Sequence, residues 1–91
     1  MLTPYRTETF NAQLKALRNN QAVVARIFRL IADACEHPFS GLGKPEPLKY
    51  GKAGLWSRRI DKKNRLIYKV VKPDLILFSD FVFLHRALQL A

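Results

Sequence analysis

Apolar side chains recur at helical spacing twice in the N-terminal third of the chain. The first stripe has intervals of four and three residues and consists of Phe10, Leu14 and Leu17. Thr7 is a suitable N-cap for this helix, because its hydroxyl oxygen can accept an N–H of the first turn. The second stripe lies within residues 21–36 and consists of Val24, Ile27, Ile31 and either Ala34 or Cys35. The pair Asn19-Asn20 separates the stripes and can cap the second helix, which Pro38 ends, so we expect two consecutive helices.

A stiff loop follows, because residues 37–47 hold three prolines and two glycines. Beyond it the pattern changes to strand-like alternation. We expect strands at Leu48–Tyr50, Leu55–Asp61, Arg65–Lys72 and Leu75–Leu84, with a short edge strand at Leu2–Tyr5. The run Leu75–Phe78 is apolar on both faces, which is typical of a central strand covered on both sides. The strands supply the second layer that two helices with one apolar face each require.

The two middle strands form a hairpin whose register decides which side chains face the helices. A two-residue loop would mix apolar and charged positions, whereas a three-residue loop at residues 62–64 pairs Ile60 with Leu66 and Trp56 with Val70. We expect this longer loop, with Asn64 in the left-handed conformation. The core side then holds Trp56, Ile60, Leu66, Tyr68 and Val70, and also Arg58, for which the pattern indicates no partner. The open side holds Arg59, Arg65 and Lys69.

Length and composition predict one small globular domain spanning residues 1–91. The chain is 48% hydrophobic and 25% charged, which is typical of a folded protein. Its apolar runs reach only four residues, so no membrane-spanning helix is expected, and the N-terminus does not resemble a secretory signal. A single cysteine, Cys35, cannot form an internal disulfide. These features favour a cytoplasmic protein.

Positive charge is concentrated in the strand half of the chain. The formal net charge is +9, and residues 44–72 contain ten basic and two acidic side chains. A basic surface of this kind suits a polyanion such as nucleic acid, or an acidic protein partner. The alternative is a solvated basic face with no ligand.

Three segments carry a resemblance to a known family. They read PFSGLGKPEPLK at residues 38–49, GLWSRRI at 54–60 and RLIY at 65–68. These segments resemble the signature of YoeB-type toxins in the RelE/ParE superfamily of toxin–antitoxin toxins, over about residues 38–71. The resemblance implies an α+β fold, with two N-terminal helices packed on one face of a small twisted antiparallel sheet. It also implies a ribosome-dependent endoribonuclease that cuts mRNA. We expect no cofactor.

The resemblance assigns partners and roles as well. An acidic cognate antitoxin is implied, and operator DNA is expected to be contacted only through the antitoxin complex. The sequence is also compatible with a homodimer. Glu46 matches the family's general base and Arg65 the arginine that stabilises the scissile phosphate, while Lys49 and Arg59 match further RNA contacts. Lys44, close to Glu46, and Lys69, on the open face, complete the expected RNA-binding set. From the residues alone, Glu46 can equally be a loop carboxylate paired with a lysine.

Cleavage of RNA through its own 2′-OH requires a base, an acid and positive charge at the phosphate. The sequence has no cluster with metal-ligand spacing, so we expect a metal-free route. The family's general acid is a histidine in a C-terminal tail resembling RYHY. Ungapped alignment places Phe83 and Leu84 at the histidine and tyrosine, and His85 lies two residues further on. We expect His85 to be the acid. A toxin-fold binding protein with weak or no cleavage and a ParE-like gyrase inhibitor are the alternatives.

Overall fold

The computed structural model describes residues 1–48 and 54–80, and it contains both expected helices. Helix α1 is Glu8–Leu17 and helix α2 is Gln21–Glu36. The Thr7 hydroxyl accepts the Phe10 N–H at 3.2 Å, and the Asn20 side-chain oxygen accepts the Val23 N–H at 3.1 Å. Both predicted caps are therefore confirmed, and each satisfies a backbone donor that the helix itself leaves without a partner.

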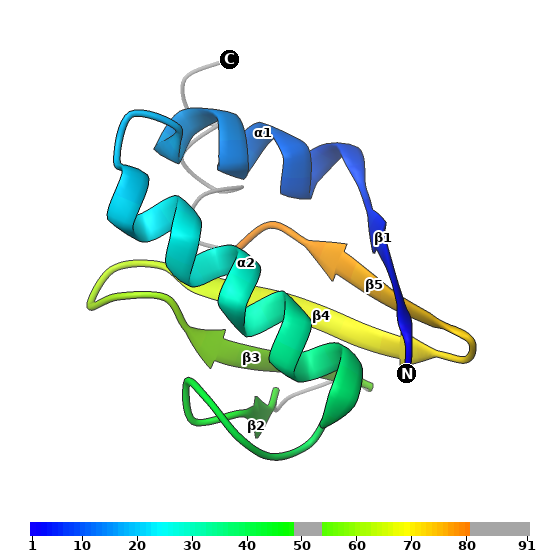
Figure 1. Cartoon of the computed structure of the whole chain (residues 1–91). Helices are drawn as coiled ribbons and strands as arrows, with labels where there is room; N and C mark the ends of the chain where they lie inside the picture. Colours follow the sequence, from blue (N-terminus) through cyan, green and yellow to red (C-terminus); the bar gives the residue numbers. More distant parts are fainter. Residues whose placement is uncertain (49–53, 81–91) are drawn as a thin grey trace.

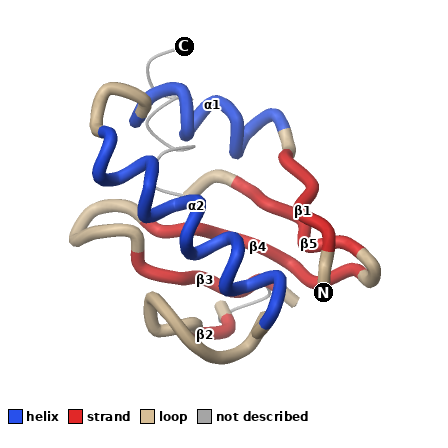
Figure 2. Tube along the Cα trace, viewed as in Figure 1, coloured by secondary structure: helices blue, strands red, loops and turns tan. Residues whose placement is uncertain are grey.

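The five described strands form one sheet. They are β1 (Thr3–Arg6), β2 (Glu46–Pro47), β3 (Leu55–Arg59), β4 (Arg65–Val71) and β5 (Asp74–Phe78), in the spatial order β1-β5-β4-β3-β2. Figure 2 shows the long loop that joins the end of α2 to β2. Strand β1 pairs with β5 in parallel and the other pairs are antiparallel, so the sheet is mixed, whereas a purely antiparallel sheet was expected. Strands β1 and β5 are far apart in the sequence, because both helices and strands β2–β4 lie between them, so no tight turn forces this pair to be antiparallel.

Both helices lie on the same face of the sheet, with α2 crossing the strands (Figure 1). The core between them contains residues from α1, α2, β4, β5 and the turn after β3: Phe10, Ile27, Leu30, Ile31, Ala34, Cys35, Ile60, Leu66, Tyr68, Leu75 and Leu77. Trp56 and Val70 pack against this core while remaining partly exposed. The predicted inner face of the hairpin is thus confirmed. Burial raises the pKa of the Cys35 thiol.

The predicted register of β3 and β4 is wrong by two residues. Trp56 pairs with Tyr68 and Arg59 with Arg65, so the connecting loop is residues 60–64. The carboxylate of Asp61 shapes this loop, because it accepts the N–H groups of Lys63 (2.8 Å) and Asn64 (2.7 Å). Burial acts to raise the pKa of Asp61, but hydrogen bonds from Asn64 and Lys63 outweigh it and lower this pKa.

The prediction that Asn64 adopts the left-handed conformation is also wrong, since among the described non-glycine residues only Lys44 has a positive φ.

A two-residue error in register leaves the faces unchanged, because strand side chains alternate with a period of two. For that reason the inner face was predicted correctly although the partners were not.

Strand boundaries also differ from expectation: β1, β3 and β4 differ at their ends by one or two residues, and β5 already ends at Phe78. The strand predicted at Leu48–Tyr50 is replaced by β2 at Glu46–Pro47, and Leu48 continues the pairing by donating to the Leu55 carbonyl at 2.9 Å. Residues 49 and 50 lie outside the described residues, as do residues 81–84 of the expected last strand. Strand β5 lies between β1 and β4, so β4 is the central strand. On β5, Leu75 and Leu77 are buried, but Ile76 and Phe78 are partly exposed.

Candidate functional site

The face of the sheet opposite the helices gathers charged side chains from three strands. Glu46 of β2 pairs with Ser57 of β3, which pairs with Ile67 of β4. Directly paired residues point to the same side of a sheet. Since Trp56 and Tyr68 face the helices, these three residues face away from them. We call this side the open face.

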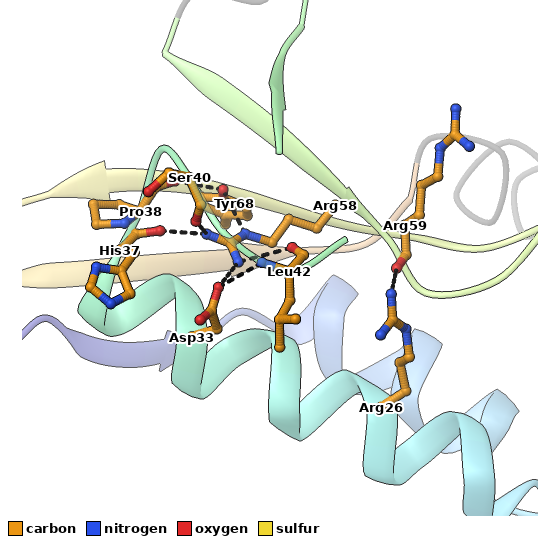
Figure 3. A network of polar contacts seen from close by, with 9 residues as sticks. All are labelled: Arg26, Asp33, His37, Pro38, Ser40, Leu42, Arg58, Arg59 and Tyr68. Atoms are coloured by element: carbon orange, nitrogen blue, oxygen red, sulfur yellow. Dashed lines mark hydrogen bonds and ion pairs between the residues drawn. The ribbon is translucent and has the colours of Figure 1, made fainter. Parts of the chain in front are cut away.

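Arg59 and Arg65 pair with one another in the neighbouring row of the open face. Lys69 pairs with Leu55 in the row on the other side of Ser57. The sequence therefore correctly predicted that Arg59, Arg65 and Lys69 share this face, and all three are exposed. Figure 3 shows the Arg59 side chain pointing away from α2.

Glu46 lies diagonally next to Arg59 across the β2–β3 pair, a relation that separates two residues by roughly 7–8 Å, with their Cβ atoms somewhat closer. Long side chains bridge such a distance. Between the charged positions, Ser57 and Ile67 are only 5% and 2% exposed. The open face thus carries a carboxylate and two guanidinium groups on neighbouring strands, and these groups suit a phosphodiester whose neighbouring hydroxyl needs a base.

The backbone of Arg65 is held on both sides by polar groups of other elements. Its N–H donates to the Asp80 carboxylate at 2.8 Å, and its carbonyl accepts from the Gln13 side chain at 3.5 Å. The same Gln13 side chain accepts the Asp80 N–H at 2.7 Å. Sequence reasoning missed both residues. The available signal was Gln13 itself, a polar residue three positions after Phe10 on the buried side of α1.

Glu46 follows a loop that lies tightly against the sheet. The Gly43 carbonyl accepts the Arg59 N–H at 2.7 Å. Gly43 has a φ of 79°, and a Cβ there would lie 2.8 Å from a methyl carbon of Leu30, so a side chain does not fit. The next residue, Lys44, is exposed with a φ of 52° and leads through Pro45 to Glu46. Lys44 and Glu46 therefore lie two residues apart at the end of this loop, and both are exposed.

Arg58, which had no partner in the sequence, is fully buried under this loop. Its guanidinium pairs with the Asp33 carboxylate at 2.5 Å and donates to the Tyr68 hydroxyl at 3.0 Å. The hydrogen bonds from Arg58 and from the Leu42 N–H hold the pKa of Asp33 below its usual value, although desolvation opposes them. Burial raises the pKa of the Tyr68 hydroxyl, although the hydrogen bond from Arg58 and its charge oppose this shift.

Two predicted site residues, Lys49 and His85, lie outside the described residues. Within residues 1–48 and 54–80, no three His, Cys, Asp or Glu side chains are grouped to hold a metal ion. In the same part of the chain, no helix is long and apolar enough to cross a membrane.

Comparison with known proteins places the chain in a family. Residues 5–83 match the family model described as YoeB-like toxin of bacterial type II toxin-antitoxin system. The chain belongs to this family of YoeB-like toxins. The matched range includes Glu46, Arg59 and Arg65 and ends two residues before His85. The recognition made from the three sequence segments is therefore confirmed.

Individual relatives agree with this assignment. The toxin YoeB of Streptomyces coelicolor is 51% identical over 59 residues, which are 65% of this chain and 70% of the relative. The toxin YoeB of Escherichia coli K12 is 40% identical over 70 residues, or 77% and 83% of the two chains.

Solved structures share the fold. A YoeB/ParE toxin from Agrobacterium tumefaciens superposes with a TM-score of 0.79 at 34% identity, covering 86% of this toxin and 94% of that chain. The YoeB dimer from Staphylococcus aureus gives 0.78 at 29% identity, covering 86% and 92%. The heterotetrameric YoeB–YefM toxin–antitoxin complex from Staphylococcus aureus gives 0.76 at 28% identity, covering 87% and 93%. Membership of the RelE/ParE-like α+β fold is thus established for this toxin.

Proposed function

We propose that this YoeB-like toxin is a ribosome-dependent endoribonuclease that cleaves mRNA by attack of a ribose 2′-OH on the adjacent phosphate. The observation that carries the proposal is the shared open face of Glu46, Arg59 and Arg65. A candidate base and two guanidinium groups on one face supply two of the three groups that this reaction requires, and the third is an acid for the leaving oxygen. Family membership supports the same activity.

In the proposed mechanism, Glu46 accepts the proton of the 2′-OH, and the freed oxygen forms a bond to phosphorus. Arg65, with Arg59 beside it, stabilises the negative charge that develops on the phosphoryl oxygens, because a guanidinium can bind two of them at once. The bond to the 5′-oxygen breaks, and His85 donates the proton that this leaving oxygen requires. The products are a 2′,3′-cyclic phosphate and a 5′-OH end.

Lys44, Lys49 and Lys69 would bind the flanking phosphates in this proposal. Lys44 and Lys69 are exposed around Glu46 and the arginine pair, and Lys49 follows β2 in the sequence. The net charge of +9 would attract RNA to this surface over long range, with an affinity that falls as salt is added.

We also propose an acidic antitoxin as the protein partner, and a homodimer as a second assembly. Support comes from the Staphylococcus aureus relatives, which form a YoeB–YefM complex and a YoeB dimer. The excess of basic over acidic residues complements an acidic partner. Operator DNA would be bound only through the antitoxin complex, and the toxin would act in the cytoplasm, where mRNA is translated.

One observation favours a second function. Phe83 and Leu84 stand where the family tail has histidine and tyrosine. A toxin without a working general acid would bind ribosomes and cleave slowly or not at all, since general acid catalysis typically contributes about 10²–10⁴-fold.

The test is translation of a defined mRNA in vitro with and without the purified toxin, followed by mapping of RNA ends. Fragments with 5′-OH ends that appear only when ribosomes translate the message support cleavage. Intact mRNA on stalled ribosomes supports the binding protein. Trapped gyrase–DNA complexes, with translation unaffected, would instead indicate a ParE-like activity and overturn the proposal.

A further inference from the structure

The buried Arg58 makes most of its hydrogen bonds to one loop. Its guanidinium donates to the carbonyl oxygens of His37 (2.5 Å), Ser40 (2.8 Å) and Leu42 (3.0 Å). All three belong to the segment between α2 and β2 that ends at Glu46. Figure 3 shows the guanidinium at the centre of these contacts.

Two further residues complete the contact between Arg58 and the loop. Asp33 of α2 accepts from both the Arg58 guanidinium and the Leu42 N–H, the latter at 2.9 Å. Tyr68 of β4 accepts from Arg58 Nε and donates its own hydroxyl proton to the Pro38 carbonyl at 2.6 Å. Asp33, Arg58 and Tyr68, which we call the clamp, therefore join α2, β3 and β4 to the loop.

We propose that the clamp positions Glu46, with Arg58 as a positioning residue that sets the path of the loop without touching the substrate. The inference rests on the proposed nuclease function, because it explains how the candidate base reaches the open face. Ser57 and Arg59, on either side of Arg58, face the open side. Strand β3 therefore carries both Arg59, a candidate phosphate-binding residue, and Arg58, which holds the loop that leads to Glu46.

The clamp lies close to Glu46 along the chain. Its contacts run from His37 to Leu42, and the Gly43 carbonyl is bonded to the Arg59 N–H one residue later. Only Lys44 and Pro45 separate this anchored stretch from Glu46. A shift of the loop would therefore also move the Glu46 carboxylate. A misplacement of about 1 Å in a reacting group can reduce the rate roughly 100-fold.

Lysine cannot replace Arg58 in this role. A planar guanidinium offers five N–H donors in a fixed fork, whereas an ammonium offers three on a flexible stem. The loop also fits Asp33 closely, because a Cβ on Gly41 would collide with the Asp33 carboxylate and Gly41 has a φ of 105°. Arg58→Lys therefore keeps the positive charge and removes the planar fork of N–H donors. The variant separates the effect of the charge from the effect of the hydrogen bonds to the loop.

Two contacts report whether the loop is in place independently of any cleavage. The Leu42 N–H is bonded to Asp33, so its hydrogen-exchange rate measures that contact. Phe39 of the loop packs on Trp56, the only tryptophan of the chain, with ring centroids 4.8 Å apart. Quenching of Trp56 fluorescence by acrylamide therefore follows the same loop.

The experiment compares Arg58→Lys and the milder Tyr68→Phe with Asn20→Ala, a control that weakens the α2 cap far from the loop. Each variant is measured at a temperature where circular dichroism shows it fully folded. Single-turnover cleavage on programmed ribosomes then separates the maximal rate from the toxin concentration at half-saturation.

For Arg58→Lys we expect a fall of about tenfold or more in the maximal rate, at a half-saturating concentration within about twofold of the unmodified toxin. Leu42 exchange and Trp56 quenching should both rise. Tyr68→Phe should produce the same three changes as Arg58→Lys, each smaller: a lower maximal rate, faster Leu42 exchange and stronger Trp56 quenching. Asn20→Ala should change none of these three quantities.

A maximal rate for Arg58→Lys equal to that of Asn20→Ala would overturn the inference. This holds whether both rates match that of the unmodified toxin or both fall by the same factor, because general destabilisation would then explain an equal fall. If the unmodified toxin does not cleave mRNA, the proposed function fails, and Leu42 exchange and Trp56 quenching alone decide whether Arg58 sets the loop. Unchanged values in Arg58→Lys would reject the clamp.

Discussion

The Asp80 carboxylate accepts the backbone N–H of Arg65 at 2.8 Å, which ties the first residue of β4 to a residue that follows β5. Gln13 of α1 contacts both of them. The candidate phosphate-binding arginine therefore begins its strand against a buried polar cluster, and its side chain extends from a fixed point of the backbone. This polar cluster lies at the first residue of β4, three residues before the clamp residue Tyr68.

Asp80→Ala should lower both stability and cleavage. Removal of a hydrogen bond to a charged group costs about 1.5–3 kcal/mol, and the Arg65 N–H would lose its acceptor. Urea unfolding would measure the loss of free energy, and cleavage assays on ribosomes would show a reduced maximal rate. Alanine at the exposed Glu8 is the control. Equal unfolding free energies for Asp80→Ala and Glu8→Ala would contradict this role of Asp80.

Glu46→Gln and Arg65→Ala should abolish most cleavage and leave the fold intact. Both side chains are exposed, so we expect stability changes of about 0.5 kcal/mol or less. Loss of a general base should reduce the rate by about 10²–10⁴-fold, and loss of a group that stabilises the developing charge by about 10²–10³-fold. Lys15→Ala, which removes a positive charge from α1, should cleave normally. Near-normal cleavage by Glu46→Gln would remove Glu46 from the mechanism.

His85→Ala should reduce cleavage by about 10²–10⁴-fold if this residue donates the proton to the leaving 5′-oxygen. The chain has two histidines, so His37→Ala is a matched control that should retain activity. The measurement is the single-turnover rate on programmed ribosomes. Unchanged rates for His85→Ala would show that another group, or water, supplies the proton.

Acid should destabilise the toxin partly through Asp33. The bonds from Arg58 and Leu42 lower the pKa of Asp33 in the folded state, so its ionised form favours folding. The resulting stability is present above the pKa of the unfolded chain, near 3.8, and is lost as the pH falls through the lower folded value. Asp33→Asn should therefore be less stable at pH 7 and lose less stability than the unmodified toxin between about pH 5 and pH 2.

Urea unfolding at several pH values would measure this difference. His37 also lies near the Asp33 carboxylate and acts in the same direction as Arg58. If the unfolding free energies of Asp33→Asn and of the unmodified toxin fall by the same amount as the pH is lowered through the acid range, Asp33 does not contribute to the acid sensitivity.

Local periodicity was sufficient to predict the helices, their caps and the faces of the hairpin. The stripe of Phe10, Leu14 and Leu17 and the alternation around Tyr68 depend only on residues a few positions apart. The same alternation correctly grouped Arg59, Arg65 and Lys69. These features follow from the sequence because helix and strand periods determine side-chain direction before any distant contact forms.

Tertiary structure alone decided how distant segments meet. The parallel pairing of β1 with β5, the register of Arg59 opposite Arg65 and the burial of Arg58 against Asp33 each join residues from separate elements. Their energies depend on desolvation and on hydrogen bonds that exist only once the elements are packed. A charged residue on an apolar face showed that Arg58 needed a partner, but only the folded loop identified that partner.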